Sequence, residues 1–285
     1  MMKEKDFHLC DPTWCSGCGI YAIFSAMKKT ASAMELKPEE MVVVTGIGCH
    51  GRLNNYLKAY GFHTLHGRAL PVAQGVKLAN KRLKVIAVSG DGDAYSIGLG
   101  HFIHAVRRNV NITYIVVNNM IFGLTLGQTS PTSRKGFVSI STPLGSKESP
   151  LCGPHLALVS GGTFIARGFS GAPKQLNRLI EKGIRHSGFS LIEVFSPCVT
   201  HNLMNTYDWF RKNTFDVDQE EGYDPMNREK AWLLLNNKQK LAMGLLFQEE
   251  GPSFDDLVLT VKTPLVQGEM FINQNKVDKI LNKFE

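Results

Sequence analysis

Short, continuous apolar runs rich in β-branched residues alternate along the chain with longer stretches whose apolar positions recur at helical spacing. The runs predict strands of a parallel sheet, because a strand covered on both faces carries apolar side chains at successive positions. They span residues 41–45, 85–89, 112–117 and 191–195. The stretches between them predict helices at residues 19–33, 68–79, 96–107 and 173–186. The alternation indicates an α/β fold with a doubly wound, mostly parallel sheet.

Two later segments depart from this pattern. Residues 129–153 hold three prolines and nine Ser or Thr residues with little periodicity, so we expect a long surface loop of the kind that is often functional. Beyond residue 200, a polar and aromatic segment precedes a predicted helix over residues 227–248 and a mixed tail. We therefore expect one domain over residues 1–210, with a cysteine-containing N-terminal segment, and a C-terminal helical extension or arm over residues 211–285.

Composition and charge exclude several classes of protein. The 285 residues are 43% apolar and 20% charged, a mixture that can bury a sizeable core. The net charge of +7 comes from dispersed Lys and Arg residues rather than from a basic arm, so nucleic acid is not an expected partner. The sequence shows neither a secretion signal nor an apolar run of membrane-spanning length, so we expect a cytoplasmic protein without a membrane partner.

Residues suited to binding metal and phosphate follow two of the predicted strands. The run at 85–89 leads directly into a Gly-Asp-Gly-Asp sequence at residues 90–93, and the next strand leads into an Asn-Asn pair. The two glycines let the backbone approach a phosphate closely. The Asp91 carboxylate and the Asn119 amide oxygen are hard ligands that suit Mg²⁺, and adjacent parallel strands deliver both to one edge of the sheet. Gly-Asp-Gly alone is a common turn, but the combined spacing favours a magnesium and diphosphate site.

The six cysteines include a pair, Cys15 and Cys18, at the start of a predicted helix. In a reducing compartment this spacing points to metal or redox chemistry before a disulfide. Cys49 and Cys198 follow predicted strands and could converge with the pair at the same sheet edge, as the ligands of an iron–sulfur cluster do. A zinc knuckle or unrelated buried cysteines are the alternatives.

Taken together, these motifs resemble the β subunits of the 2-oxoacid:ferredoxin oxidoreductases, and the two-subunit 2-oxoglutarate type in particular. The match runs in order from about Thr13 to Phe210. The residues that carry it are Trp14-Cys15-Ser16-Gly17-Cys18-Gly19, Gly46-Ile47-Gly48-Cys49-His50-Gly51-Arg52, His66-Gly67-Arg68, Gly90-Asp91-Gly92-Asp93, Asn118-Asn119 and Gly123-Leu124-Thr125-Leu126-Gly127-Gln128-Thr129-Ser130-Pro131-Thr132. The resemblance implies that residues 1–210 form a thiamine diphosphate-binding domain of the pyrophosphate type.

The resemblance also implies a set of site residues. Mg²⁺ would be held by the side chains of Asp91 and Asn119 and by the backbone oxygen of Ile121. The ligands of a [4Fe–4S] cluster would be Cys15, Cys18, Cys49 and Cys198, which leaves Cys10 and Cys152 without a role. We expect His66 to contact the cofactor or the substrate carboxylate and to take part in catalysis. Thiamine diphosphate would lie against Ile47, Gly48, Cys49, His50, His66, Gly92, Asp93, Gly123, Leu124, Thr125, Leu126, Gly127 and Gln128.

An enzyme of this family would decarboxylate a 2-oxoacid, pass the electrons singly through the cluster to ferredoxin and transfer the acyl group to coenzyme A. The resemblance implies that the glutamate that activates thiamine belongs to an α subunit, in a dimer of heterodimers, so this chain would be catalytically incomplete alone. Leu124 cannot offer the amide found in single-chain pyruvate enzymes, which favours 2-oxoglutarate. A leucine rather than a lysine at position 126 argues against a broad substrate range.

Several other functions are alternatives to this one. Pyruvate could be the substrate of the same type of enzyme. A non-redox thiamine decarboxylase or carboligase would need no cysteines and would carry its own pyrimidine-binding domain in a considerably longer chain. A non-catalytic iron–sulfur electron-transfer subunit would not need Asp91 and Asn119, and a zinc-binding scaffold would be colourless.

Overall fold

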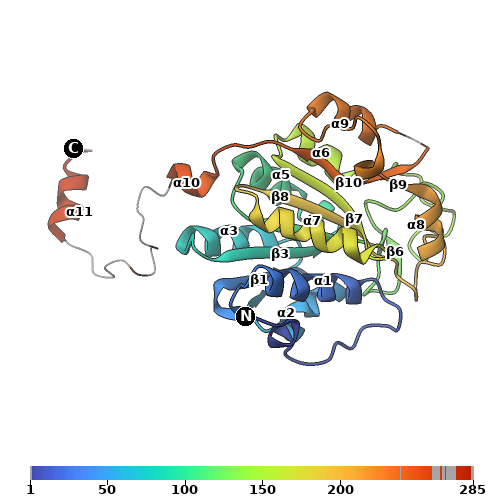
Figure 1. Cartoon of the computed structure of the whole chain (residues 1–285), viewed down its shortest axis with the longest axis horizontal. Coiled ribbons are helices and arrows are strands. Elements are labelled where there is room, and N and C mark those ends of the chain that lie inside the picture. The colour runs from blue at the N-terminus through green and yellow to red at the C-terminus, as the bar shows by residue number, and fades with distance from the viewer. Residues whose placement is uncertain (1, 238, 259–263, 265–266, 268–273, 284–285) are drawn as a thin grey trace.

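A single mixed sheet forms the centre of the computed structural model, which describes residues 2–237, 239–258, 264, 267 and 274–283. Its strands are β1 (Met41–Thr45), β2 (Tyr60–His63), β3 (Lys84–Gly90), β4 (Thr113–Asn118), β7 (Phe164–Phe169), β8 (Ser190–Phe195), β9 (Thr214–Asp216) and β10 (Leu241–Gln248). Within the described residues they lie in the order β2-β1-β3-β4-β8-β7-β10-β9 (Figure 1). Neighbours from β2 to β7 are parallel, whereas β10 is antiparallel to β7 and parallel to β9.

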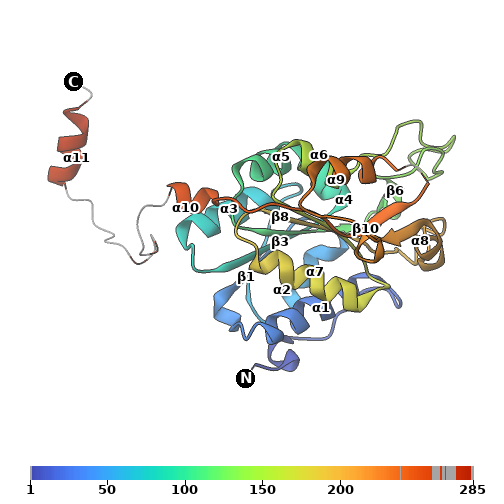
Figure 2. The same cartoon turned by 45° about the horizontal axis from the view of Figure 1, so that its top comes forward.

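Helices cover both faces of the sheet (Figure 2). One face carries α1 (Ile20–Ala33) and α7 (Pro173–Arg185), and the other carries α3 (Ala69–Ala79), α5 (Leu99–Arg108), α6 (Gly153–Val159) and α9 (Arg228–Leu235). Successive side chains of β1 therefore enter different cores: Val43 packs with α1 and α7, whereas Val42 and Val44 pack with α3 and α5. This two-sided burial is the reason that the strands have continuous apolar runs.

The predicted α/β fold is confirmed, with the four predicted strands and the four predicted helices close to their expected bounds. The third helix begins at Leu99 instead of residue 96, because residues 91–95 form a separate short helix, α4 (Asp91–Tyr95), after which the backbone leaves helical geometry at Ser96. Residues 129–153 are, as expected, almost without regular structure; they contain one isolated bridge, between Ser139 and Thr142.

The helix predicted over residues 227–248 is wrong. Helix α9 ends at Leu235, and residues 241–248 form β10. The apolar run in β10 is too short for its periodicity to separate a buried strand from a buried helix. The segment is a strand because it forms an antiparallel ladder with β7, and the left-handed backbone of Gly244, φ +109°, does not fit a helix. The strands β9 and β10 lie beyond residue 210 and join the same sheet as the strands before that residue. The domain boundary expected at residue 210 stays a prediction.

The remaining elements are short and lie in the connections. They are the 3₁₀ helices at Glu4–Phe7, Pro38–Glu40, Cys49–Arg52 and Val217–Gln219, the helices α2 (Leu53–Tyr56), α8 (Tyr207–Asn213), α10 (Phe254–Val258) and α11 (Gln274–Leu281), and the hairpin of β5 (Ile121–Phe122) and β6 (Gln128–Thr129). Helix α11 stands apart from the sheet in both views (Figures 1 and 2). Within the described ranges, no helix has the length and apolar character needed to cross a bilayer.

Candidate functional site

The carboxyl ends of β1, β3 and β4 surround a cavity of about 210 Å³, here called the cofactor cavity. Parallel neighbours bring their following loops to one edge of the sheet, where ligands of such folds bind. The cavity is lined by predicted site residues from each of these loops. They are Ile47, Gly48, Cys49 and His50 after β1, Asp91, Gly92 and Asp93 after β3, Asn119, Ile121, Gly123, Leu124 and Thr125 after β4, and His66.

Asp91 is a buried carboxylate that forms no ion pair with any residue that the structure describes. Its Oδ2 accepts hydrogen bonds from Ser130 Oγ at 2.5 Å and Thr132 Oγ1 at 2.6 Å. Burial raises the pKa of Asp91 to about 6, although both hydroxyls oppose the rise; the charged neighbour that acts on it, Glu193, is itself an anion. A cation bound in the cavity would stabilise the ionised, buried carboxylate of Asp91. The environment of Asp91 therefore fits the predicted role of metal ligand.

The Asn-Asn pair is held in place by local hydrogen bonds. Asn119 Oδ1 accepts from the backbone N–H of Ile121 at 3.0 Å, and Asn202 donates to the Asn119 carbonyl at 2.9 Å. Asn118 is buried; its Oδ1 accepts from the Met120 N–H at 3.0 Å and lies 3.0 Å from Thr132 Oγ1. Asn119 and Ile121 therefore face the cofactor cavity, whereas Asn118 supports the loop from behind.

Two glycines are required by the geometry of this cavity. A Cβ on Gly92 would lie 2.2 Å from Cε1 of Phe122, so only glycine lets the ring close the loop. Gly48 has φ +154°, and a Cβ there would lie 2.6 Å from Cε1 of His50. Both glycines line the cofactor cavity, and the rings packed against them leave no space for a larger residue at either position.

The two motif histidines occupy different environments. His50 is buried, and its Nε2 accepts a 3.1 Å hydrogen bond from the Gly90 N–H. Burial lowers the pKa of His50 to about 4, against the opposing charge of Asp93, so its ring is neutral at pH 7. His66 is partly exposed, and its Nδ1 lies 2.8 Å from Asp93 Oδ1. The same carboxylate oxygen accepts from the N–H groups of Gly67 at 2.7 Å and Ile47 at 3.2 Å, which fixes Asp93 beneath the imidazole.

The loop after β5 turns back sharply. The Gly127 N–H donates to the Phe122 carbonyl at 2.9 Å, and Thr125 Oγ1 donates to Gln128 Oε1 at 2.6 Å. Leu126 has a left-handed backbone, φ +78°. Gly123, Leu124 and Thr125 line the cofactor cavity, whereas Leu126, Gly127 and Gln128 close the hairpin and do not belong to its wall. The role of the latter three in binding stays a prediction.

Four cysteines line a second cavity, of about 400 Å³, here called the cysteine cavity. These are the four predicted cluster ligands, Cys15, Cys18, Cys49 and Cys198. The N-terminal pair reaches the sheet edge through Trp14, whose Nε1 donates to the Cys49 carbonyl at 2.8 Å and whose ring meets Tyr21 and Tyr56 edge-on. The cofactor and cysteine cavities share a wall that contains Gly48, Cys49, Asn119, Gly123 and Leu124. A ligand in one cavity would therefore be the direct neighbour of a ligand in the other.

The thiols of this cavity influence one another. Burial raises the pKa of Cys18 to about 11, and the proximity of Cys198, Cys49 and Cys15 adds to the rise. Burial and the neighbouring thiols also raise the pKa of Cys49, and thiols whose ionised forms are disfavoured in this way suit a ligand that carries positive charge. No three His, Cys, Asp or Glu side chains in the described part of the chain gather tightly enough to hold a single metal ion. The residues fit a multi-iron cluster, which spreads its thiolates over a wider cage.

Ser130, Thr132 and Phe122 are site residues whose contacts the sequence did not predict. The two hydroxyls lie in the long polar loop, in a Ser-Pro-Thr sequence that follows the β5–β6 hairpin. The motif that carries the family resemblance includes Ser130-Pro131-Thr132, but no pattern in it indicated that the two hydroxyls contact Asp91. The pairing of His66 with Asp93 was also not predicted, because the two are 27 positions apart on separate loops.

Exposed large apolar side chains lie on loops that line or adjoin the cofactor cavity, and are here called the apolar rim. They are between 39% and 78% exposed and lie on separate loops: Ile47, Leu65, Ile97, Leu124 and Leu126. Ile47 and Leu124 line the cavity itself, and Ile97 packs against Gly67, the neighbour of His66. Exposed apolar side chains gathered beside a cavity are typical of a surface that another protein covers.

Comparison with known proteins identifies the family. The family model "Thiamine pyrophosphate enzyme, C-terminal TPP binding domain" matches residues 46–194, and the model of the C-terminal part of the pyruvate ferredoxin oxidoreductase β subunit matches residues 198–263. The β subunit of 2-oxoacid:ferredoxin oxidoreductase 2 from Aeropyrum pernix is 44% identical over 215 residues, which are 75% of this chain and 70% of that one. The chain belongs to the 2-oxoacid:ferredoxin oxidoreductase β subunits. This β subunit is thus part of a thiamine diphosphate-dependent oxidoreductase.

Two further relatives have 2-oxoglutarate in their names. The 2-oxoglutarate oxidoreductase subunit KorB of Mycobacterium tuberculosis is 43% identical over 221 residues, which are 77% of this chain and 57% of that one. A solved 2-oxoglutarate:ferredoxin oxidoreductase from Magnetococcus marinus has a TM-score of 0.91 and 34% identity and covers 98% of this chain and 96% of its own. That structure holds 2-oxoglutarate, coenzyme A and succinyl-CoA.

Proposed function

We propose that this chain is the β subunit of an enzyme that oxidatively decarboxylates 2-oxoglutarate to succinyl-CoA and passes the electrons through a [4Fe–4S] cluster to ferredoxin. The observation that carries the proposal is the wall shared by the cofactor and cysteine cavities. Cys49 is part of this wall and lines both cavities. When bound, thiamine diphosphate would supply the electron sink for loss of CO₂, and the cluster would carry single electrons.

The chain's own residues would hold these groups at the sheet edge. Asp91 and Asn119, with the Ile121 carbonyl, would hold Mg²⁺, and the glycines at 90 and 92 would admit the diphosphate. Cys15, Cys18, Cys49 and Cys198 would hold the cluster. The neutral ring of His50 accepts from Gly90 N–H and so fixes the start of the diphosphate loop.

His66 is the residue we assign to the substrate side of the cofactor cavity. Its Nδ1 faces Asp93, so the carboxylate favours a proton on this nitrogen and orients the ring. The other ring nitrogen is then available to the reacting groups as a hydrogen-bond acceptor, or as a donor when the ring is protonated. Asp93 serves as the positioning residue, held by the backbone of Gly67 and Ile47.

An α subunit would complete the active site. A β subunit implies such a partner, and the apolar rim of Ile47, Leu65, Ile97, Leu124 and Leu126 offers it an exposed surface, of which Ile47 and Leu124 line the cavity. Covering this rim would exclude water from the reaction and bring in the activating glutamate that the family resemblance places on the α subunit. We propose a dimer of such heterodimers.

The preference for 2-oxoglutarate rests on relatives of this chain. The names of the KorB proteins and of the Magnetococcus marinus structure support this substrate. Pyruvate is the second candidate, favoured by the family model that matches residues 198–263. Coenzyme A as acyl acceptor is supported by the same solved relative.

The test is an activity assay on the β subunit produced anaerobically together with its α subunit. We expect coenzyme A-dependent reduction of ferredoxin with 2-oxoglutarate, and iron and thiamine in the purified complex. Activity with pyruvate alone would replace the substrate and leave the enzyme class intact. Iron without thiamine would instead support the non-catalytic electron-transfer subunit, and zinc without iron would overturn the redox function.

A further inference from the structure

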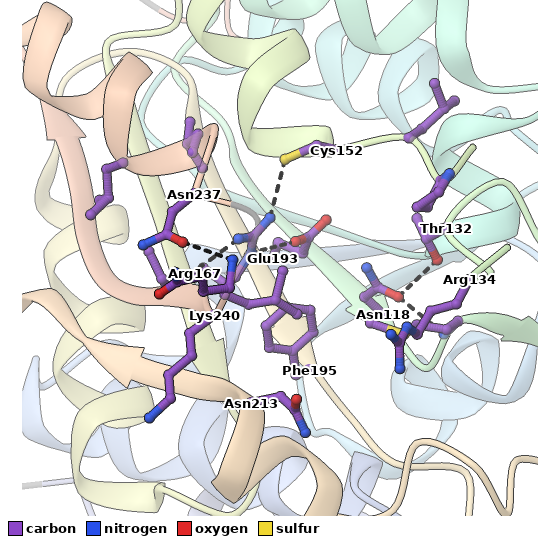
Figure 3. A pocket seen from close by; sticks show the side chains of 18 of the residues that line it. Asn118, Thr132, Arg134, Cys152, Arg167, Glu193, Phe195, Asn213, Asn237 and Lys240 are labelled. Carbon is purple, nitrogen blue, oxygen red and sulfur yellow. Dashed lines mark hydrogen bonds and ion pairs between the residues drawn. The ribbon is translucent and has the colours of Figure 1, made fainter.

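A third cavity, of about 250 Å³, plays no part in the proposed function. It lies beside the sheet among β7, β8 and β10, with α8, the end of α9 and the segment 150–152 completing its wall (Figure 3). Its floor contains a buried ion pair, and its lining includes Cys152, one of the two cysteines outside the cysteine cavity.

The ion pair joins Arg167 of β7 to Glu193 of β8. The two residues are direct neighbours in the parallel ladder, and Arg167 Nε donates to Glu193 Oε2 at 2.7 Å. Both are almost fully buried, 4% and 1% exposed. Tyr95 adds a 3.1 Å hydrogen bond from its hydroxyl to Glu193 Oε1. A buried pair satisfied in this way holds the guanidinium rigidly.

Arg167 presents its remaining donors to the cavity wall. Its Nη1 donates to the Ala242 carbonyl at 3.4 Å, and its Nη2 donates to Cys152 Sγ at 3.3 Å. Figure 3 shows the sulfur directly above the guanidinium, at the edge of the cavity. Cys152 is therefore a nucleophilic atom beside a fixed cation, next to a space that a small molecule can enter.

The electrostatic environment of Cys152 differs from that of the cluster cysteines. Burial disfavours its thiolate, but the Arg167 guanidinium and hydrogen bonding with His155 outweigh burial, so the pKa of Cys152 lies below its usual value. The pKa of Cys18, in the cysteine cavity, is shifted in the opposite direction. Reactive thiols occur where a cation stabilises the thiolate.

We propose that Cys152 is a modification site that reacts with a small hydroperoxide entering this cavity. The thiolate attacks one peroxide oxygen; the S–O bond forms as the O–O bond breaks. The sulfur loses two electrons and becomes sulfenic acid, while the peroxide gains them and leaves as hydroxide or alkoxide, which takes a proton from solvent. Arg167 holds the sulfur as the attacking anion, and the space beside it admits the peroxide.

Cys10 provides an internal comparison. It is exposed, and its thiol donates a hydrogen bond to the Asn55 carbonyl at 3.3 Å. Exposure alone would make Cys10 the faster of the two, whereas the environment of Arg167 makes Cys152 faster. The order of the two rates therefore separates the proposal from simple accessibility.

The test uses the complete complex with its α subunit, loaded with its cofactors and kept anaerobic. A substoichiometric pulse of hydrogen peroxide is followed by dimedone, and the labelled peptides are quantified by mass spectrometry. We expect Cys152 to be labelled on the order of tenfold faster than Cys10, and to keep its own rate as the pH is lowered through about 8.5, the ordinary thiol value.

Matched variants assign the label. Cys152→Ser should lose the fast label and keep the slow one, and Cys10→Ser should do the reverse. Because the comparison of rates is made within the unaltered protein, it stands even where a variant fails to fold. Labelling of Cys10 at an equal or higher rate than Cys152 would overturn the proposal, whichever 2-oxoacid the enzyme uses.

Discussion

Thr132 donates a 2.6 Å hydrogen bond to Asp91, across 41 positions of sequence, and so ties the long polar loop to the turn after β3. The same hydroxyl oxygen lies 3.0 Å from Asn118 Oδ1, so one threonine joins the acidic turn to the Asn-Asn pair. The arrangement explains why a loop of little regular structure has a buried position at Thr132. It also leads to the first prediction.

Thr132→Val should weaken binding of the magnesium–diphosphate group. The variant keeps the shape of the side chain but removes a hydrogen bond to a charged group, an interaction worth about 1.5–3 kcal/mol. We expect the Kd of Mg²⁺–thiamine diphosphate, measured by titration calorimetry, to rise about tenfold or more. Thr129→Val is the control, because its hydroxyl bonds within the loop to Ser139, Ser141 and Thr142 and not to Asp91. Equal effects of the two variants would contradict the role of Thr132.

The cofactor-free chain should lose stability as the pH rises because of Asp91. Burial raises the pKa of this carboxyl from 3.8 to about 6, so the folded state favours the protonated form. Its contribution to the free energy of unfolding is fully present below pH about 4 and is lost as the pH rises through about 6. At about 1.4 kcal/mol per pKa unit, the loss is about 3 kcal/mol.

Denaturant unfolding across this pH range checks the prediction. Asp91→Asn cannot ionise and should remove this part of the pH dependence. Magnesium affinity should change in the opposite direction, rising over the same range as Asp91 ionises. If the free energy of unfolding of Asp91→Asn kept the full pH dependence of the natural chain, a group other than Asp91 would be responsible.

Cys198→Ala should lose most of the iron of the complex, because Cys198 lines the cysteine cavity with the other three predicted ligands. Iron analysis and the visible spectrum of the anaerobically purified protein measure the effect. Cys10→Ala is the matched control. Because Cys10 lies outside the lining of that cavity, the complex with this variant should keep its iron. An unchanged spectrum in Cys198→Ala would exclude this residue as a ligand.

His66→Gln should lower kcat on the order of 100-fold, the usual contribution of a positioned acid or base. Thiamine diphosphate binding should change much less, because the residues proposed to hold Mg²⁺ and the diphosphate lie on other loops of the cavity, at 90–93 and 119–121. Asp93→Asn should produce part of the same loss and alter the pH profile of kcat, as expected for a residue that positions His66. His101→Gln, on α5 and outside the lining of the cofactor cavity, is the control. A loss of cofactor affinity that matches the loss of kcat would assign His66 to binding alone.

Much of the fold and part of the site could be predicted from the sequence, for a physical reason. Buried parallel strands have continuous apolar runs, and the loops after such strands share one edge, so the meeting of Asp91 with Asn119 followed from their places after β3 and β4. Contacts made by side chains from irregular segments could not be predicted. Ser130 and Thr132 reach Asp91 from a loop without periodicity.

Two kinds of sequence signal were too weak to interpret correctly. The strand β10 consists of an apolar run that suits either a helix or a strand, and pairing with β7 decides between them. The strand β2 has four exposed residues at the sheet edge, so burial left no pattern in its sequence. The docking of the N-terminal segment depends on Trp14 packing against Tyr21 and Tyr56, which is a tertiary contact.

The central claim is that thiamine diphosphate and an iron–sulfur cluster bind on the two sides of the wall that contains Cys49. Its most direct test is electron paramagnetic resonance of the anaerobic complex with its α subunit, recorded before and after addition of 2-oxoglutarate in the absence of ferredoxin. We predict that the substrate produces the signal of a reduced [4Fe–4S] cluster and that the Asp91→Ala complex, with its iron retained, produces none. A natural complex that contains both thiamine diphosphate and iron but yields no such signal with 2-oxoglutarate or pyruvate would contradict the claim.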